Sequence, residues 1–130
     1  MIKLTLNEMW AIGLFEGEGS IVTPTGRGRS SVLIIQMCDE DVLRKFNSIV
    51  GVGHISGPYN YNKNKNVRYK SVWKWSTAKR DDVRKLLTRW LPFLGERRKV
   101  RAISALKRLD QPTKKPGPKP KYERTGLAWL

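Results

Sequence analysis

The sequence predicts an α+β fold with the element order αββαββαα, in which helices alternate with two β-hairpins. Three observations predict it: capping residues ahead of apolar residues at helical spacing, two pairs of β-branched runs separated by polar turns, and two amphipathic segments after the second pair. A chain of 130 residues suffices for one hydrophobic core. We therefore expect one domain over residues 1–110 and a tail rich in proline and lysine over 111–130.

The first predicted helix begins at a capping box, Thr5-Leu6-Asn7-Glu8, and runs to about Gly17. Gly13 and Gly17 are four residues apart and so share one face of it. A glycine inside a helix costs up to about 1 kcal/mol relative to alanine, so the close approach of another backbone would explain both. For Gly17, as for Gly19, the alternative is a role in ending the helix.

This helix ends in two carboxylates, Glu16 and Glu18, that alternate with glycines. A carboxylate near a helix C-terminus opposes the macrodipole and costs about 0.3–1 kcal/mol. A divalent cation would offset that cost, because carboxylates and backbone carbonyls are the ligands that hard cations such as Mg²⁺ prefer.

The first predicted hairpin joins residues 20–25 to residues 30–38. Pro24 restricts its first strand to an edge or bulged position. A second helix follows, with Asp39 as its N-cap and Gly51 at its end. Its apolar stripe comprises Val42, Leu43, Phe46, Ile49 and Val50.

The second predicted hairpin joins residues 52–59 to residues 67–77. Its second strand shows the clearest period-2 pattern of the chain, which predicts one buried and one positive face. Tyr69, Trp73 and Trp75 face one way, whereas Arg68, Lys70 and Lys74 face the other.

Two helices are predicted to end the domain, over 79–91 and over 95–109. The first stops before Pro92, because a helix cannot continue easily into a proline. The second carries Val100, Ile103 and Leu106 on one side. It begins with the cations Arg97, Arg98, Lys99 and Arg101.

The chain is strongly basic. It has 26 Lys and Arg against 11 Asp and Glu, a net charge of +15, so we expect a nucleic-acid partner and no small-molecule substrate. A ribosomal-type or generally adhesive surface is the alternative, and the clustered Glu16 and Glu18 argue against it.

Cys38 is the one cysteine, which excludes an intramolecular disulfide and fits the cytoplasm, an organelle or a phage-infected cell. Without a signal-peptide pattern or a long apolar run, neither secretion nor a membrane is expected.

The block Ile12-Gly13-Leu14-Phe15-Glu16-Gly17-Glu18-Gly19, in this element order, resembles the LAGLIDADG homing endonucleases. Val-Gly-Val-Gly-His-Ile at 50–55 and Trp-Leu-Pro-Phe-Leu at 90–94 extend the resemblance over about residues 5–109. It implies that family's fold, with a curved four-stranded antiparallel sheet that binds DNA. The chain departs from the motif in beginning with Ala11-Ile12 and in having two glutamates. The extra methylene of glutamate moves the carboxylate, and Mg²⁺ binding is sensitive to the geometry of its ligands.

A single motif copy implies a homodimer that cuts both strands of a long, nearly palindromic DNA site with Mg²⁺ or Mn²⁺. The interface would include Trp10, Gly13 and Gly17, with Glu18 and a carbonyl near Gly17 as metal ligands. Glu16 is either a packing or capping carboxylate or a direct metal ligand.

The family also has a catalytic lysine shortly after its Pro-Phe-Leu segment. Counting from Pro92 gives Arg97, with Arg98 and Lys99 as competitors for the role. The alternative is that all three only contact the phosphate backbone.

Base or phosphate contacts are expected from polar side chains on the strands and the first turn, because Arg and Lys suit guanine and Gln suits adenine. They are Arg27, Arg29, Gln36, Ser56, Arg68, Lys70 and Lys74. Two other functions keep the same fold: a DNA-binding regulator that does not cleave, and an RNA splicing maturase. The presence of Glu18 favours the nuclease.

Overall fold

The computed structural model describes residues 3–24, 30–60 and 71–111. Over these residues the predicted order of helices and hairpins is confirmed. The elements are α1 (Leu6–Glu18), β1 (Gly19–Val22), β2 (Val32–Met37), α2 (Glu40–Val50), β3 (His54–Tyr59), β4 (Val72–Thr77), α3 (Arg80–Trp90), a short 3-10 helix η1 (Leu91–Phe93) and α4 (Glu96–Asp110). Helix α3 ends at Trp90, ahead of Pro92 in η1, because a helix does not continue easily into a proline.

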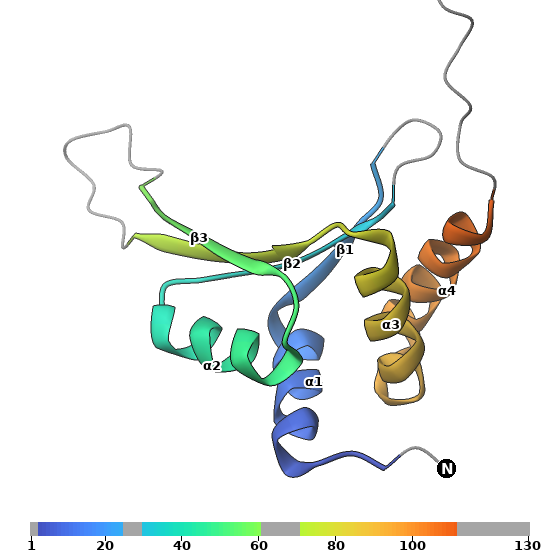
Figure 1. The fold of residues 1–130 in the computed structure, drawn as a ribbon, viewed down its shortest axis with the longest axis horizontal. Coiled ribbons are helices and arrows are strands. Elements are labelled where there is room, and N and C mark those ends of the chain that lie inside the picture. Colours follow the sequence, from blue (N-terminus) through green and yellow to red (C-terminus); the bar gives the residue numbers. More distant parts are fainter. Residues whose placement is uncertain (1–2, 25–29, 61–70, 112–130) are drawn as a thin grey trace, which may run out of the picture.

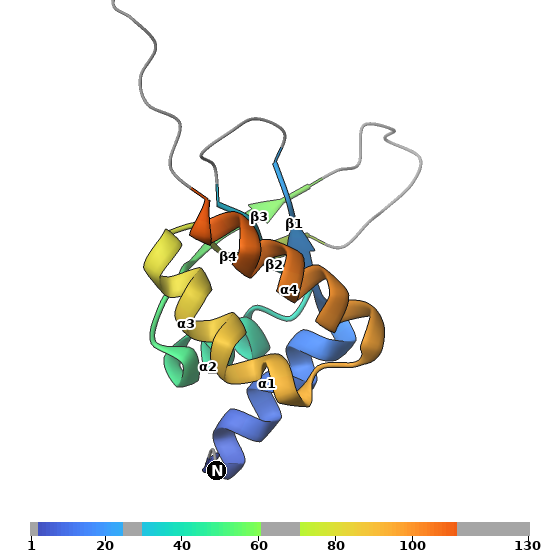
Figure 2. The ribbon, with the colours of Figure 1, turned by 90° about the vertical axis from the view of Figure 1, so that its right-hand side faces the viewer.

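The four described strands form one antiparallel sheet in the order β1-β2-β4-β3. Figure 1 shows a curved sheet with α1, α2 and α3 on one face and no helix on the other. Helix α4 packs beside α3 and contacts β1, and Figure 2 shows α3 and α4 side by side. Strand β1 lies at the sheet edge, one of the two positions that Pro24 predicted. The strand ends at Val22, earlier than predicted, so Pro24 lies after it and not within it.

The core lies between the covered face of the sheet and the helices. Leu33, Ile35 and Trp75 point into it from the strands, because alternate residues of a strand share a face. The Trp75 ring meets Phe46 nearly edge-on, with centroids 4.7 Å apart. Its indole Nε1 donates 3.1 Å hydrogen bonds to Asn47 Oδ1 and to the carbonyl of Val52, so this buried aromatic leaves no polar atom unpaired.

The helix ends largely follow their capping signals. In α1 the Glu8 amide donates to Thr5 Oγ1 over 3.0 Å, and the Thr5 amide donates to Glu8 Oε1 over 3.4 Å, which confirms the capping box. Gly51 ends α2 at a φ of 74°. Asp39 occupies the N-cap position of α2, but its side chain makes no capping hydrogen bond there; its ψ is 91°, against 163° at Thr5.

The side of α4 that carries Val100 and Ile103 faces solvent, with exposed fractions of 67% and 41%. Ala102, Ala105 and Leu109 are buried instead. Small alanines allow α4 to approach its neighbours closely, and Val100 and Ile103 lie outside the contact. Among the described residues, no helix is long and apolar enough to cross a bilayer.

Candidate functional site

The open face of the sheet carries side chains in rows that cross the strands. Gln36 of β2 is the register partner of Lys74 of β4, which in turn pairs with Ser56 of β3. Residues paired in antiparallel strands point to the same face, so these three predicted DNA contacts form one row. A second row runs through Ser20, Ile34, Ser76 and His54.

Glu18 lies at the edge of this open face. It is the last residue of α1, and β1 begins directly after it at Gly19. Its exposed side chain lines a hollow of about 380 Å³ together with Ser20, Val22, Ile34 and Gln36. The structure therefore brings Glu18 and Gln36, predicted for separate roles, into one hollow.

Arginines of α4 lie on the other side of Ser20. Arg97, Arg98 and Arg101 line a hollow of about 220 Å³ with Gly19, Ser20 and Ile21. Because Ser20 lines both hollows, the carboxylate and the arginine cluster are neighbours. The sequence analysis named Arg101 only as one of four cations at the start of this helix, and it did not single out Ser20. The signals were available, because Ser20 is the first polar residue of its strand and Arg101 follows Arg97 by one helical turn.

The three basic candidates at the start of α4 differ in their surroundings. Arg97 is exposed and lines the arginine hollow, whereas half-buried Lys99 is not among the lining residues. Arg98 uses its guanidinium within the fold: Nη2 donates to the carbonyl of Gly19, and Nη1 lies 3.9 Å from Oε1 of Glu16.

The face of α1 that points away from the core is apolar and open. A Cβ added at Gly13 or Gly17 would meet nothing within 4 Å. Leu6 and Met9 lie on the same side, with exposed fractions of 84% and 55%. Trp10 is half-buried, and Lys45 Nζ lies 4.2 Å above its ring.

Four predicted DNA contacts, Arg27, Arg29, Arg68 and Lys70, lie outside the described residues. So does the predicted tail, from residue 112 onward. Within the described residues, no three His, Cys, Asp or Glu side chains form a cluster that could hold a metal ion. Among the described residues that line the hollow on the open face, Glu18 is the one that carries a carboxylate.

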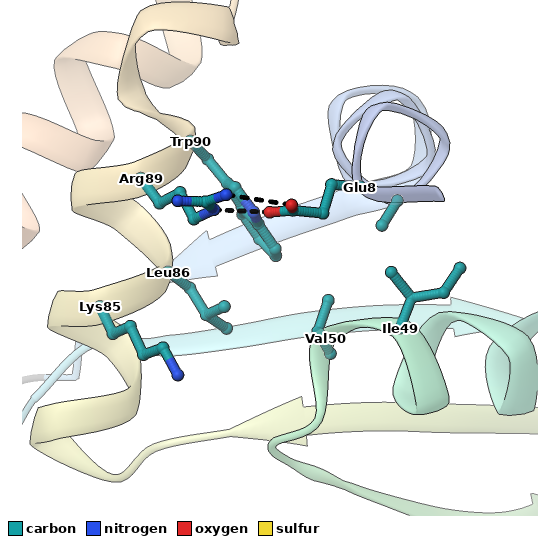
Figure 3. A pocket seen from close by; sticks show the side chains of 8 residues that line it. Glu8, Ile49, Val50, Lys85, Leu86, Arg89 and Trp90 are labelled. Atoms are coloured by element: carbon teal, nitrogen blue, oxygen red, sulfur yellow. Dashed lines mark hydrogen bonds and ion pairs between the residues drawn. The ribbon is translucent and has the colours of Figure 1, made fainter. Parts of the chain in front are cut away.

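A further hollow of about 270 Å³ lies near the start of α1, between that helix, the end of α2 and α3 (Figure 3). Arg89 and Glu8 pair across it with distances of 2.5 and 3.0 Å. Here the hydrogen bonds from Arg89 hold the pKa of the Glu8 carboxyl below its ordinary value. Glu8 and Glu18 are separated by roughly 15 Å along the helix, so this hollow is not part of the Glu18 site.

No protein-family model matches the sequence, and neither does any curated protein. Solved structures do match the fold. The homing endonuclease I-CvuI, in complex with its target in the presence of Ca, superposes with a TM-score of 0.58 at 16% identity, covering 75% of this chain and 62% of that one. This chain has the homing-endonuclease fold.

Two other structures have the same fold. The homing endonuclease I-TnaI matches with a TM-score of 0.59 and 16% identity over 83% of this chain and 73% of its own. The archaeal intron-encoded homing endonuclease I-Vdi141I, complexed with DNA, matches with a TM-score of 0.51 and 15% identity over 84% of this chain and 88% of its own. The chain spans 62–66% of the two I-CvuI structures that it matches.

Proposed function

We propose that this protein is a LAGLIDADG-type homing endonuclease that acts as a homodimer and hydrolyses both strands of a specific DNA site with a divalent metal. The observation that carries this proposal is the position of Glu18. Its carboxylate lines a hollow on the open sheet face, beside an arginine cluster, in a chain of net charge +15. A carboxylate is an unfavourable neighbour for a phosphate backbone unless it serves chemistry there.

The donor set fits a hard divalent cation. Among the described residues no cation pairs with the exposed carboxylate of Glu18, so it is available as a ligand. A backbone carbonyl near Gly17 would add a further oxygen ligand. A bound Mg²⁺ or Mn²⁺ supplies a water of lowered pKa and positive charge at the phosphate. The second carboxylate would come from the other subunit.

The arginine cluster would bind the reacting strand. Arg97 and Arg101 are exposed beside Ser20 and extend from one helix face. Fixed guanidinium groups at a phosphate stabilise the charge that develops during hydrolysis. We assign this role to Arg97, with Arg101 as a second phosphate ligand and Lys99 as a more distant backbone contact.

The exposed face of α1 supports the homodimer. Glycines with open space above them allow two helices to approach closely, and Leu6 and Met9 would be buried by the contact. A two-fold interface uses the same patch on both subunits. Pairing α1 with its copy along Trp10, Gly13 and Gly17 would bring the two Glu18 residues to the symmetry axis.

Sequence recognition is assigned to the open sheet face, because the major groove of B-DNA admits β-strands. Gln36, Lys74 and Ser56 form the described part of this surface. Arg27, Arg29, Arg68 and Lys70 would add contacts from the segments around it.

The test is cleavage of a randomised double-stranded DNA library by the purified protein in Mg²⁺, Mn²⁺ or Ca²⁺, with the ends of all products sequenced. We expect a single nearly palindromic site, cut on both strands in Mg²⁺ or Mn²⁺. Enrichment of a site without cut products would overturn the nuclease and identify a DNA-binding regulator. Selective binding of a structured RNA, with no DNA site enriched, would instead identify the maturase function.

A further inference from the structure

Two side chains behind Glu18 join the end of α1 to the start of α4. Arg98, in the first turn of α4, donates a hydrogen bond to the carbonyl of Gly19, the residue after Glu18. Its Nη1 lies 3.9 Å from Oε1 of Glu16. The peptide that follows the proposed metal ligand is therefore held from α4.

Gly95 provides the space for this contact. A Cβ at Gly95 would stand 2.7 Å from Oε1 of Glu16. The φ of Gly95 is −70°, which any residue adopts, so the glycine is needed for space and not for its backbone conformation. Gly95 is the N-cap of α4, and negative charge is favourable at a helix N-terminus. The Glu16 carboxylate therefore opposes the macrodipole of α1, because it lies at the C-terminus of that helix. The macrodipole of α4 stabilises it, because it lies at the N-terminus of α4.

The pair is only partly accessible to solvent. The Arg98 side chain is 17% exposed and that of Glu16 is 36% exposed. Glu16 Oε2 and Arg98 Nε are buried and have no hydrogen-bond partner among the described residues. Removing one of the two side chains would leave a partly buried, unpaired charge on the other, so we treat them as one unit.

Gly19 is also held from the opposite side. Its amide donates to the carbonyl of Phe15 in α1, while its own carbonyl accepts from Arg98. A Cβ at Gly19 would lie 2.6 Å from the Phe15 carbonyl oxygen, so no larger residue fits. These contacts fix both peptide groups of Gly19 and, with them, the direction in which Glu18 leaves α1.

We propose that Arg98 and Glu16 are positioning residues, which fix the backbone at Glu18 so that its carboxylate faces the open hollow. Arg98 acts on Glu18 through Gly19 and is not the cation that contacts the reacting phosphate. This inference rests on the proposed function, because it takes Glu18 as the metal ligand. Arg97, one position earlier and exposed, is its matched comparison.

The contact itself is tested by NMR on the metal-free protein, which requires no activity. We expect Arg98→Met and Glu16→Gln to shift the Gly19 carbonyl ¹³C and the Ser20 amide ¹⁵N signals in the same direction, because both belong to the peptide that Arg98 holds. Arg97→Met, which removes the same charge one residue away, should leave both signals in place. Unshifted signals in both Arg98→Met and Glu16→Gln would overturn the proposal. If Arg98→Met does not fold, Glu16→Gln decides, because it keeps the shape of the side chain.

The positioning role is tested by titrating Mn²⁺ into the DNA-bound protein and measuring both metal binding and single-turnover cleavage. We expect Arg98→Met and Glu16→Gln to raise the Mn²⁺ midpoint about 10- to 100-fold with little change in DNA affinity, as is typical when support of a metal ligand is lost. Their double variant should be no worse than either single one, because they act as a unit. Arg97→Met should slow cleavage at an unchanged midpoint.

If Arg98→Met or Glu16→Gln slows cleavage at the wild-type Mn²⁺ midpoint, Arg98 is a phosphate contact and the positioning role is overturned. Failure of the proposed function looks different. In that case the wild-type protein itself shows no Mn²⁺ binding that depends on Glu18, whereas the NMR signals still report on the contact. Lys107→Met, at the exposed end of α4, controls for the loss of one positive charge.

Discussion

Arg89 pairs with Glu8 through both edges of its guanidinium group, with Nε 2.5 Å from Oε2 and Nη2 3.0 Å from Oε1. The same guanidinium donates to the carbonyl of Lys3 over 3.0 Å. The pair joins the end of α3 to the start of α1, the helix that carries Glu18 at its other end. It is also the place where a carboxyl pKa is clearly lowered.

The lowered pKa of Glu8 predicts a pH-dependent stability. Hydrogen bonding to Arg89 lowers the pKa in the folded state, so the pair stabilises the fold fully above the unfolded value near 4.5 and loses its effect as the pH falls through the folded value. Glu8→Gln should therefore lower the melting temperature at pH 7 and lower it less at an acidic pH, below the folded-state pKa of Glu8. Glu40→Gln, which breaks an exposed pair with Arg44, is the control and should cost less. An equal effect of Glu8→Gln at both pH values would contradict this prediction.

Gly13→Ala should have opposite effects on the stability of the isolated chain and on the proposed dimer. Space around Gly13 is open, so alanine should stabilise α1 itself by up to about 1 kcal/mol. In the dimer the added methyl group would stand between the two helices. We therefore expect a weaker dimer by analytical ultracentrifugation together with a more stable monomer, whereas Asn7→Ala, on another side of α1, should leave dimerisation unchanged. A dimer unaffected by Gly13→Ala would place the interface elsewhere.

Lys74 and Gln36 are neighbours in one row but should affect DNA binding differently. Lys74→Met should reduce the slope of log K against log[salt] by about 1, the loss of one phosphate contact. Gln36→Ala should relax specificity at one base position at a cost of about 1–3 kcal/mol. Fluorescence anisotropy at several salt concentrations measures both. Lys85→Met, on α3 away from the sheet face, should leave the slope unchanged.

Gly51 and Gly53 form a matched pair for testing the link between α2 and β3. Both have positive φ, 74° and 90°. A Cβ at Gly51 meets nothing within 4 Å, whereas at Gly53 it would lie 2.6 Å from the indole nitrogen of Trp75. Alanine should therefore cost about 1–2 kcal/mol at Gly51 and about 3–5 kcal/mol at Gly53, where strain and overpacking add. Equal losses in urea unfolding would show that the Trp75 contact does not limit this position.

Much of this fold follows from local patterns in the sequence. The capping box at Thr5 and Glu8 and the stop at Gly51 are each set by residues close in the chain, and the structure confirms them. Trp75 of β4 is buried as predicted, but burial does not alternate along that strand, because Ser76 and Thr77 are buried as well. Periodicity did not show which side of α4 enters the core, because close packing selects Ala102 and Ala105 over the larger Val100 and Ile103.

The position of Glu18 at the end of its helix was predictable from the sequence, and its role as a metal ligand stays a prediction. Relationships between distant segments were not predictable. The sequence does not reveal that Ser20 adjoins Arg101, or that Arg98 donates to a backbone carbonyl, because both depend on how α4 packs against β1. Counting from Pro92 gave Arg97, with Arg98 and Lys99 as competitors, and the fold adds that the three side chains differ in their surroundings.

The most direct test of the account is Glu18→Gln on the selected DNA site, measured as single-turnover cleavage with DNA saturated by protein. Removing a metal-binding carboxylate should slow cleavage of both strands by at least about 100-fold, within the range that transition-state electrostatics contributes. The DNA dissociation constant should stay within about threefold, because glutamine keeps the shape of the side chain, and the exposed control Asp81→Asn should cut at the wild-type rate. Cleavage by Glu18→Gln at the wild-type rate would contradict the central claim that this carboxylate makes the protein a nuclease.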